Sequence, residues 1–534
     1  MTGTDYREQV FHIAVGDGGA SADCDMLGFK AWNLARMARV GLNVPPAFVL
    51  GTSWCRRWRE GREVSLDSIL PLHVRWLEQR TGRHFGGVRR PLMVSVRSGA
   101  PVSMPGMMDT LLDIGLCDAS MEGFLRATGN PRLVWDAYRR LVRSFGEVVT
   151  RLPPDPFDAL EADWVTRHGV QRTGDLDYAA LRELTRESLQ LYRRLSGEDF
   201  PQDPREQLFR SIIAVFESWD SERAVTYRGL NAIDDSLGTA VTVQAMVFGN
   251  GGGTSGSGVG FTRDPGNGLR GLYVDFQFNA QGEDVVSGRH AVGGGLDDLS
   301  RRMPATVREL EIIAEVLESE FGDMQEFEFT IEDGTLYILQ TRSGKRTPWA
   351  SLVIAVEMME EGLLTHDAMR ERLAGLDLDR ISRRRSLSSS GESPLASGVG
   401  TGPGVAAGCI AVSGKGAHRL AKEGMPVILV RDDIATDEID AISFSEGVLS
   451  KFGGRTSHAA VVARQMDKVC IVACQGLECD PENSLIKLGG HILREGDYLT
   501  LDGESGMVFA GEVASELEFP TAWLDRLRSS AAGA

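Results

Sequence analysis

Apolar residues near the N-terminus first follow a helical period and then form short strand-like runs. Between positions 28 and 40 they recur every three or four residues, and Gly41 and Pro45-Pro46 come directly after them. This spacing and these stop signals predict a helix that ends near residue 40. The apolar run Ala47–Leu50 predicts a strand, and a further strand followed by a loop is expected over Leu92–Pro105.

The middle of the chain changes from helical to strand-like patterning. Residues from about 119 to 230 are rich in charge and mostly helical in period, which predicts a helical subdomain. Strands are expected at Ala240–Phe248, Gly271–Phe278 and Gln325–Thr341. The glycine-rich stretch Gly249–Gly260 between the first two predicts a flexible loop that closes over phosphates, with a plain flexible loop as the alternative.

Beyond residue 346 the pattern predicts a helical region to about 378 and then an exposed linker. The segment Arg383–Gly391 is polar and has no apolar period, so its arginines are interpreted as solvated rather than as a binding patch. The tail Ser529–Ala534 is expected to fray. Between linker and tail, strands and helices alternate in a compact β/α domain, with elements expected at Gly408–Val412, Pro426–Val430, Gly447–Leu449, Ala459–Arg464, Val469–Ala473 and Asp497–Leu501.

Composition places the chain among ordinary soluble globular proteins. Its 534 residues are 42% hydrophobic and 25% charged, which allows roughly three to four domains with a large core. The net charge of −18 argues against a generic nucleic-acid binder, although a few arginines in one cleft are enough for a phosphate site. No secretory signal and no run of about eighteen apolar residues is visible, so a cytoplasmic location without a membrane span is expected.

The seven cysteines are odd in number and form no evenly spaced framework, which predicts reduced thiols. Cys470, Cys474 and Cys479 lie close together in the sequence. However, Cys470 falls in an apolar run, and no CxxC pair or nearby histidine completes a zinc set. We therefore do not expect a metal site at these cysteines.

His458 follows a pattern that is typical of an anion-binding helix start. Gly453 and Gly454 allow a tight turn after a strand, and Thr456 or Ser457 can cap a helix in whose first turn His458 lies. The free N–H groups and the positive helix end at that point favour a phosphoryl group. They also favour an imidazole pKa below its reference of about 6.5, so a neutral, nucleophilic side chain is expected at pH 7.

Cations and oxygen ligands for a nucleotide are predicted elsewhere in the chain. Lys30 begins a helix, and Arg97 ends a β-branched strand, where a guanidinium can clamp phosphate. Glu326, Glu328 and Gln340 offer carboxylate and amide oxygens that suit Mg²⁺. These three residues share a face only if the hairpin loop has three residues, 332–334, so the longer loop is predicted.

Several motifs together resemble pyruvate, phosphate dikinase and its relatives, including phosphoenolpyruvate synthase, with the dikinase branch the closer of the two. The resemblance covers nearly the whole chain in order. It rests on the segments Val94–Ala100, Ser103–Thr110, Gln244–Asn250, Gly260–Pro265, Asn279–Gly288, Leu339–Arg346 and Gly453–Arg464.

The resemblance implies an α/β (α+β) fold with an ATP-grasp nucleotide-binding domain at 1–345 and a helical insertion at about 119–230. A helical and flexible linker at 346–397, a small swivelling β/α phosphohistidine domain at 398–515 and a tail at 516–534 are expected to follow. It further implies nucleotide or phosphate binding by Lys30, Arg97, Gln244 and Arg342, magnesium at Glu326, Glu328 and Gln340, a phosphohistidine loop containing Gly453, Gly454, Thr456 and Ser457, and catalysis by His458.

The implied activity is ATP-dependent phosphorylation of His458 with inorganic phosphate as co-substrate, followed by transfer to pyruvate or another acceptor. Relatives continue into a barrel domain that binds pyruvate or phosphoenolpyruvate, and this sequence stops before such a domain. A separate acceptor-binding protein or subunit is therefore expected, and a homo-oligomer is left open. The alternatives are a phosphotransferase for a different small-molecule acceptor and a non-catalytic nucleotide-binding paralogue.

The sequence also departs from the family pattern. Phe29 and Ala31 flank Lys30 where relatives usually carry glycines, so nucleotide affinity or selectivity is expected to differ. Glu326 stands where the family more often has aspartate. Gln465 and Asp467 replace residues that are commonly glycine.

Overall fold

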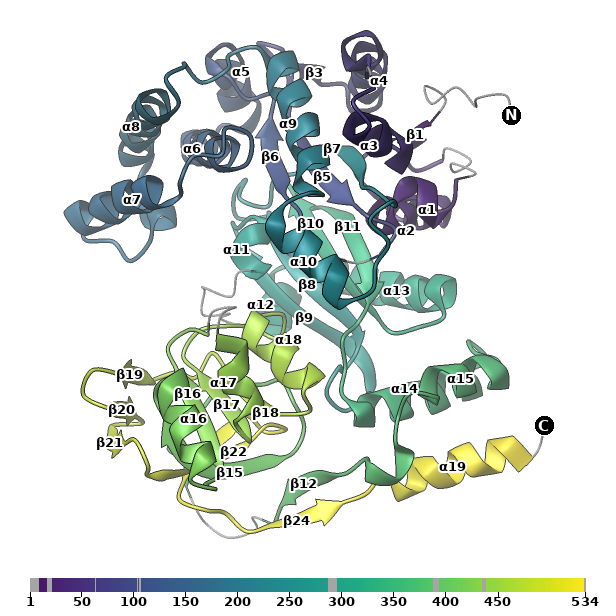
Figure 1. Ribbon diagram of the computed structural model, residues 1–534, viewed down its shortest axis with the longest axis vertical. Coiled ribbons are helices and arrows are strands. Elements are labelled where there is room, and N and C mark those ends of the chain that lie inside the picture. The colour runs from purple at the N-terminus through teal and green to yellow at the C-terminus, as the bar shows by residue number, and fades with distance from the viewer. Residues whose placement is uncertain are drawn as a thin grey trace. The chain divides into compact units, whose positions relative to one another are not determined.

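The computed structural model describes residues 9–16, 22–62, 64–102, 104, 107–286, 295–387, 393–434 and 438–532 (Figure 1). At His458 it describes the backbone. The motif residues Ser103, Pro105, Gly106, Ser287 and Gly288 and the linker residues 388–391 lie outside the described residues. The chain divides into two compact units, Met1–Thr254 with Ile331–Gln340, and Ser255–Thr330 with Thr341–Ala534.

The first unit is built around an antiparallel five-stranded sheet with the order β1-β2-β7-β5-β6. Its apolar residues pack with those of the helical insertion in one core, which joins Val94 and Val243 of the sheet to Tyr138 and Phe145 of the insertion. Its five strands are β1 (Val10–Ile13), β2 (Ala47–Leu50), β5 (Val94–Gly99), β6 (Thr110–Ile114) and β7 (Ala240–Ala245). A separate two-stranded parallel sheet contains β3 (His84–Phe85) and β4 (Pro91–Leu92).

The helices of the first unit include the predicted helix near residue 40 and the predicted helical subdomain. The first group is α1 (Cys24–Leu27), α2 (Phe29–Arg39), α3 (Thr52–Arg59) and α4 (Leu66–Thr81). The subdomain contains α5 (Asp118–Thr128), α6 (Pro131–Val148), α7 (Asp155–His168), α8 (Tyr178–Ser196), α9 (Pro204–Ser218) and α10 (Glu222–Leu230). Its helices have ordinary caps, such as Asn130, whose side chain accepts from the Leu133 amide at the start of α6.

The second unit begins with strands of a four-stranded sheet whose order is β11-β10-β8-β9. Its strands are β8 (Gly256–Arg263), β9 (Arg270–Phe278), β10 (Gln325–Glu332) and β11 (Thr335–Ser343), and the hairpin β10–β11 is divided between the two units. The helices between β9 and β10 are α11 (Gly282–Val286), α12 (Gly295–Arg302) and α13 (Pro304–Phe321).

The glycine-rich stretch is only partly a loop, which corrects the sequence prediction. Residues from Gly256 onward form β8, and its glycines lie under aromatic rings. A Cβ atom on Gly258 would lie 2.5 Å from Cζ of Phe329, and one on Gly260 would lie 2.4 Å from Cζ of Phe327. These glycines are therefore needed for close packing of the sheet and not for loop mobility.

The predicted exposed linker is also partly ordered. Helices α14 (Pro348–Glu360) and α15 (His366–Leu373) are followed by β12 (Arg383–Ser386), which pairs with β24 (Ser515–Glu518). Arg383 forms an ion pair with Glu518 at 2.8 Å and lies over the Trp349 ring at 4.3 Å. The interpretation of these arginines as a purely solvated run is therefore wrong at Arg383.

The predicted frayed tail is largely helical. Helix α19 extends over Thr521–Ala532, and residues 533–534 lie outside the described part of the chain. Trp523, Leu524 and Leu527 pack against the core that α14 and α15 share. The apolar face of α19 explains why a polar, alanine-rich end remains ordered as far as Ala532.

The β/α domain expected between linker and tail contains an eight-stranded sheet with the order β13-β23-β22-β15-β16-β17-β18-β14. Its strands are β13 (Ala396–Ser397), β14 (Val399–Gly400), β15 (Val405–Ala411), β16 (Val427–Arg431), β17 (Gly447–Ser450), β18 (Val469–Val472), β22 (Tyr498–Asp502) and β23 (Met507–Ala510). The four strands β15 to β18 are parallel. A separate small sheet contains β19 (Glu478–Asp480), β20 (Leu485–Leu488) and β21 (His491–Arg494).

Helices cover one face of this eight-stranded sheet. They are α16 (Gly414–Lys422), α17 (Ile439–Ser443) and α18 (His458–Gln465). Their apolar residues, such as Leu420, Ile442 and Ala463, form one core with alternate strand residues. The other strand residues, such as Ile428 and Ile471, pack with the small sheet in a second core. The connection from β17 to α18 therefore lies at the carboxyl end of parallel strands, where such folds place ligands.

Candidate functional site

The segment between β17 and α18 positions His458 at a helix N-terminus, as predicted. Ser457 is the N-cap, and its side chain accepts a hydrogen bond from the Ala460 amide. Gly453 has a φ of 118°, which favours glycine, and a Cβ atom there would lie 3.0 Å from the Ser457 Oγ. His458 is thus the first residue of α18. The backbone amides in the first turn of a helix favour an anion.

Asp275 on β9 contacts this segment in the second unit. The Thr456 amide donates to Oδ2 of Asp275 at 3.2 Å, and the Thr456 hydroxyl donates to the same oxygen at 3.4 Å. Burial raises the pKa of the Asp275 carboxyl, while Arg455 and the amides of Arg455 and Thr456 act in the opposite direction. Sequence reasoning did not single out Asp275, although an acidic residue inside the apolar run 272–278 was the available signal.

Arg464 on α18 is the second residue that sequence reasoning did not single out. Its side chain is fully buried, and none of its three guanidinium nitrogens has a hydrogen-bond partner among the described residues. The Phe261 ring lies 5.6 Å from the guanidinium carbon. Burial lowers the pKa of Arg464, and Glu326 is the largest of the groups that oppose this effect. A buried cation without hydrogen-bond partners is unusual, because most buried polar groups in proteins are hydrogen-bonded.

Arg97, Gln244 and Gln340 come together in the first unit. Nη2 of Arg97 donates to Oε1 of Gln340 at 2.7 Å, and Nη1 donates to Oε1 of Gln244 at 3.5 Å. Gln244 is buried in β7 and also donates to the carbonyl of Pro45 at 3.2 Å. Arg97 lies inside β5 opposite Thr242, so the expectation that it ends its strand is wrong. Three of the predicted nucleotide-site and metal-site residues are nevertheless in direct contact.

Lys30 is the second residue of α2, as the sequence predicted. The start of this helix abuts the end of β5, because the Phe29 amide donates to the carbonyl of Ala100 at 2.8 Å. Gly28 has a φ of 74°, and a Cβ atom there would lie only 1.9 Å from the carbonyl oxygen of Gly99. Glycine is therefore required where the helix carrying Lys30 meets the strand carrying Arg97.

Arg342 and two predicted metal ligands lie in the second unit. Nη2 of Arg342 forms an ion pair with Oε1 of Glu326 at 2.6 Å. Burial acts to lower the pKa of Arg342, but Glu326 and Glu328 outweigh it and raise the pKa. Oε2 of Glu326 is buried and has no hydrogen-bond partner among the described residues. This oxygen is therefore suited to a further cationic ligand.

The turn of the β10–β11 hairpin corrects the predicted loop. It contains two residues, Asp333 and Gly334, whose φ angles of 47° and 81° are those of a type I′ turn, so the predicted three-residue loop is wrong. Thr341 nevertheless donates to the Gln325 side chain at 3.0 Å. Together with the Arg342–Glu326 ion pair, this contact places Glu326 and Arg342 on one face. That Glu328 and Gln340 share a face stays a prediction.

Two protein-family models match parts of this chain. The family described as "Pyruvate phosphate dikinase, AMP/ATP-binding domain" matches residues 62–292, and "PEP-utilising enzyme, mobile domain" matches residues 424–506. The chain carries both domains. The mobile domain includes the Ser457 cap and the start of α18, and the mixed α/β fold predicted from the sequence is confirmed.

Similar curated proteins are longer than this chain. Pyruvate, phosphate dikinase of Clostridium symbiosum is 40% identical over 520 residues, which cover 95% of this chain and 59% of that protein. The enzyme of Rhizobium meliloti (strain 1021) is 41% identical, with 93% and 57% covered. Pyruvate, phosphate dikinase 2 of Zea mays is 38% identical, with 98% and 60% covered. The chain thus spans about three fifths of the curated relatives it matches.

The part of the chain that the structure describes contains no group of three or more His, Cys, Asp or Glu side chains arranged to hold a metal ion. The candidate magnesium set has a different composition, with two carboxylates and one amide, and the unpaired Oε2 of Glu326 fits a cation. Within the described ranges, no helix is both long and apolar enough to cross a membrane.

Proposed function

We propose that the chain uses ATP to phosphorylate His458 and then passes the phosphoryl group to an acceptor, as the resemblance to pyruvate, phosphate dikinase implies. The proposal rests above all on one observation. His458 begins a Ser457-capped helix after a glycine turn, inside the residues that match the mobile domain of PEP-utilising enzymes. Helix N-termini of this kind stabilise phosphate through their amides and dipole.

In the proposed reaction a nitrogen of His458 attacks the β-phosphorus of ATP, the bond to the α-phosphate oxygen breaks, and AMP leaves. Inorganic phosphate then takes the terminal phosphoryl group, which gives pyrophosphate and phosphohistidine. Lys30, Arg97 and Arg342 neutralise the developing phosphate charge, and Gln244 fixes the Arg97 guanidinium through their hydrogen bond. The 346–397 linker is proposed to let the histidine leave the nucleotide.

Magnesium belongs to this proposal as the partner of ATP. Glu326, Glu328 and Gln340 would hold it, and the unpaired Oε2 of Glu326 supports that assignment. When bound, the ion supplies charge neutralisation at the phosphate oxygens. The ion pair of Arg342 with Glu326 keeps that guanidinium oriented by its carboxylate neighbour.

The final acceptor is proposed to be pyruvate bound by a separate chain. The relatives that carry the name pyruvate, phosphate dikinase are the basis for naming pyruvate. If the acceptor chain is required, phosphohistidine should persist with pyruvate alone and disappear when a pyruvate-binding domain of a relative is also added. Decay with pyruvate alone would contradict the need for a second chain.

The test of the proposed function is acid-labile labelling with [β-³²P]ATP, Mg²⁺ and phosphate, together with release of AMP. We expect label at residue 458 in the wild type and none in His458→Ala. His491→Ala is the matched control, because His491 is exposed in β21 and lies outside the α18 segment. Undiminished label in His458→Ala, or ATP binding without any AMP, would overturn the proposal.

A further inference from the structure

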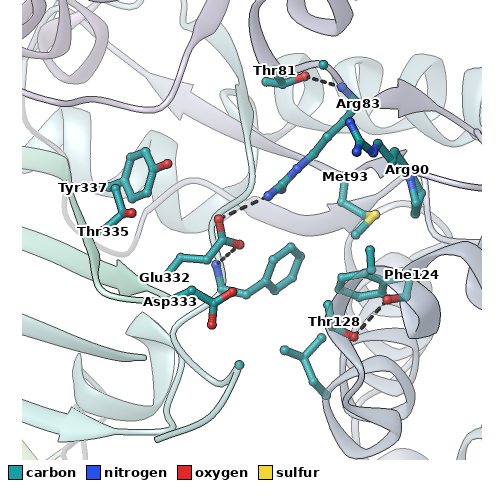
Figure 2. Close-up of a pocket in the computed structure, with 16 residues that line it drawn as sticks. Thr81, Arg83, Arg90, Met93, Phe124, Thr128, Glu332, Asp333, Thr335 and Tyr337 are labelled. Carbon is teal, nitrogen blue, oxygen red and sulfur yellow. Dashed lines mark hydrogen bonds and ion pairs between the residues drawn. The ribbon is translucent and has the colours of Figure 1, made fainter. Parts of the chain in front are cut away.

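A pocket of about 370 Å³ lies in the first unit beside the turn of the β10–β11 hairpin (Figure 2). We call it the hairpin-turn pocket. Its walls come from the end of α4, from β4, from the end of α5, from the segment after β7 and from residues 332–337. The volume falls in the range of pockets that hold small organic molecules.

The floor of the hairpin-turn pocket is apolar. Met93, Phe124, Phe248 and Leu133 line it, and each is at most 3% exposed. The rings of Phe124 and Phe248 lie 4.9 Å apart and are tilted against each other. Figure 2 shows Met93 and Phe124 on the same side of the pocket as Arg90. A flat or apolar ligand body gains contact area on such a floor.

One charged pair in the pocket is already satisfied. Nη2 of Arg83 meets Oε2 of Glu332 at 3.2 Å, and Nη1 of Arg83 donates to the carbonyl of Met246 at 3.4 Å. The other Glu332 oxygen accepts from the Phe248 amide at 3.2 Å. Figure 2 shows Arg83 reaching across the pocket to this carboxylate. Because each charge is compensated, Arg83 and Glu332 fix the walls and leave little net charge for a ligand.

Arg90 differs from Arg83. It lines the pocket and is exposed, and its guanidinium has no hydrogen-bond or ion-pair partner among the described residues. Tyr337 lines the opposite wall, and Figure 2 draws it beyond Glu332 from the two arginines. A cation above an apolar floor, with a phenol across from it, matches a ligand that has one anionic end and an apolar body.

The pocket is separate from the contact of Arg97 with Gln340. Met93 lies directly before β5 and four residues before Arg97, and Tyr337 lies three residues before Gln340 within β11. At about 3.3 Å per residue, these offsets put Met93 and Tyr337 roughly 10–13 Å along the chain from Arg97, a predicted phosphate ligand, and from Gln340, a predicted metal ligand. A small acid in the pocket therefore does not need to displace a nucleotide phosphate at Arg97.

We propose that the hairpin-turn pocket binds a small organic acid, with the apolar body on Met93, Phe124 and Phe248 and the carboxylate or phosphate on Arg90. This proposal does not depend on phosphorylation of His458. The ligand would join the end of α5, the segment after β7 and the hairpin turn through one set of contacts.

The test is ligand-observed NMR titration of the full chain with benzoate, phenyl phosphate and the neutral analogue benzamide. We expect benzoate or phenyl phosphate to bind and benzamide to bind at least several-fold more weakly. Arg90→Gln should lower the affinity for the anion about tenfold, as expected for loss of a charge-assisted hydrogen bond. Arg89→Gln is the matched control, because Arg89 is an exposed neighbour that does not line the pocket.

Three outcomes would overturn the proposal. The first is that neither anion binds, and the second is that Arg89→Gln weakens binding as much as Arg90→Gln. The third is complete displacement of the anion by a non-hydrolysable ATP analogue, which would mean that the probe occupies the nucleotide site. Tyr337→Phe supplies a second variant, and a weaker anion affinity with an unchanged melting temperature is expected. Unaltered labelling of His458 in Arg90→Gln would separate this pocket from the proposed catalytic function.

Discussion

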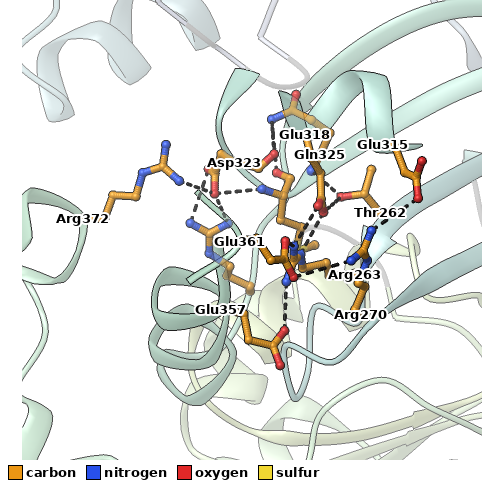
Figure 3. Close-up of polar contacts among 12 residues, drawn as sticks. Thr262, Arg263, Arg270, Glu315, Glu318, Asp323, Gln325, Glu357, Glu361 and Arg372 are labelled. Atoms are coloured by element: carbon orange, nitrogen blue, oxygen red, sulfur yellow. Dashed lines mark hydrogen bonds and ion pairs between the residues drawn. The ribbon is translucent and has the colours of Figure 1, made fainter. Parts of the chain in front are cut away.

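Arg263 and Arg464 are both fully buried in the second unit, but their surroundings differ. Arg263, at the end of β8, donates to Glu318 of α13 at 3.0 and 2.9 Å, to Glu357 of α14 at 2.9 Å and to Glu361 at 2.6 Å (Figure 3). Arg464 has a nearby aromatic ring and no hydrogen-bond partner among the described residues.

Arg263 is thus a structural arginine with carboxylate partners, whereas the guanidinium of Arg464 has no hydrogen-bonded carboxylate among the described residues. Arg263 joins β8, α13 and α14, so its charge is balanced by carboxylates from the elements it connects. Arg464 instead lies on the helix that begins at His458, and groups that form no hydrogen bond with it, Glu326 first among them, oppose the effect of burial on its pKa. Burying a charge without such partners is costly, so Arg464 should lower the stability of its surroundings.

The largest effect is expected from Arg263→Met. The substitution leaves a group of carboxylates without their shared cation, so we expect a loss of about 3–5 kcal/mol in the free energy of unfolding. Urea unfolding followed by tryptophan fluorescence measures it. Arg270→Met is the control, because Arg270 is largely exposed and its ion pairs with Glu315 at 3.3 Å and Glu361 at 3.8 Å should each contribute under about 1 kcal/mol. Equal losses in the two variants would remove the distinction between them.

Arg464→Met is expected to change the free energy of unfolding in the opposite direction. Replacing an unpaired buried cation by an apolar side chain of similar length should stabilise the protein by about 1–3 kcal/mol. The melting temperature and the urea midpoint should both rise. A clear fall in either would mean that the guanidinium is compensated in solution. A more stable variant that no longer labels His458 would show that the charge of Arg464 serves phosphoryl transfer.

A smaller effect is expected from Ser457→Ala. The Ser457 side chain accepts from the Ala460 amide at 3.4 Å, a long hydrogen bond, so loss of the cap should cost about 0.5–1 kcal/mol. Hydrogen exchange of the first-turn amides of α18 should accelerate, while exchange in α16 should not. Ser413 caps α16 in the same way, so Ser413→Ala is the matched control and should accelerate exchange in the first turn of α16 but not in α18. Unchanged exchange in α18 would contradict the assigned cap.

The smallest effect is expected from Asp275→Asn, and its sign depends on pH. Burial raises the pKa of Asp275 above the unfolded value of 3.8, so the folded state holds this proton more tightly than the unfolded state. The free energy of unfolding of the wild type therefore falls relative to that of the variant as the pH rises from below 3.8 through the folded pKa. Above the folded pKa, the gap between the two free energies stays constant. Unfolding at a series of pH values measures this difference. A wild type that gains stability relative to Asp275→Asn as the pH rises would contradict the raised pKa.

Local sequence signals correctly predicted the starts of two helices of the candidate site. The glycine turn and the Ser457 cap predicted the start of α18, and the apolar period predicted α2 with Lys30 near its beginning. These features depend on residues within a few positions of one another, so a short stretch of sequence contains the information needed. The alternating strands and helices of the β/α domain were predicted on the same basis.

Long-range pairing accounts for the incorrect predictions. The segment at Arg383 lacks an apolar period, and it becomes a strand only because Glu518 and Trp349 supply partners from distant positions. Gly258 and Gly260 resemble a loop in sequence, and their need to be glycine depends on phenylalanines of β10. The predicted hairpin loop at Asp333 was too long by one residue. The residues of this turn are compatible with a loop of two or three residues, so local composition does not decide the length.

The sequence by itself determined the mixed α/β fold and the capped helix at His458, because capping and periodicity are local properties. The candidate phosphate and metal ligands stay predictions. The tertiary structure alone decided that Arg97 contacts Gln340, that Asp275 contacts Thr456, and that Arg263 is paired whereas Arg464 is not. The physical reason is that the charge balance of a buried group depends on which distant carboxylates the fold brings to it.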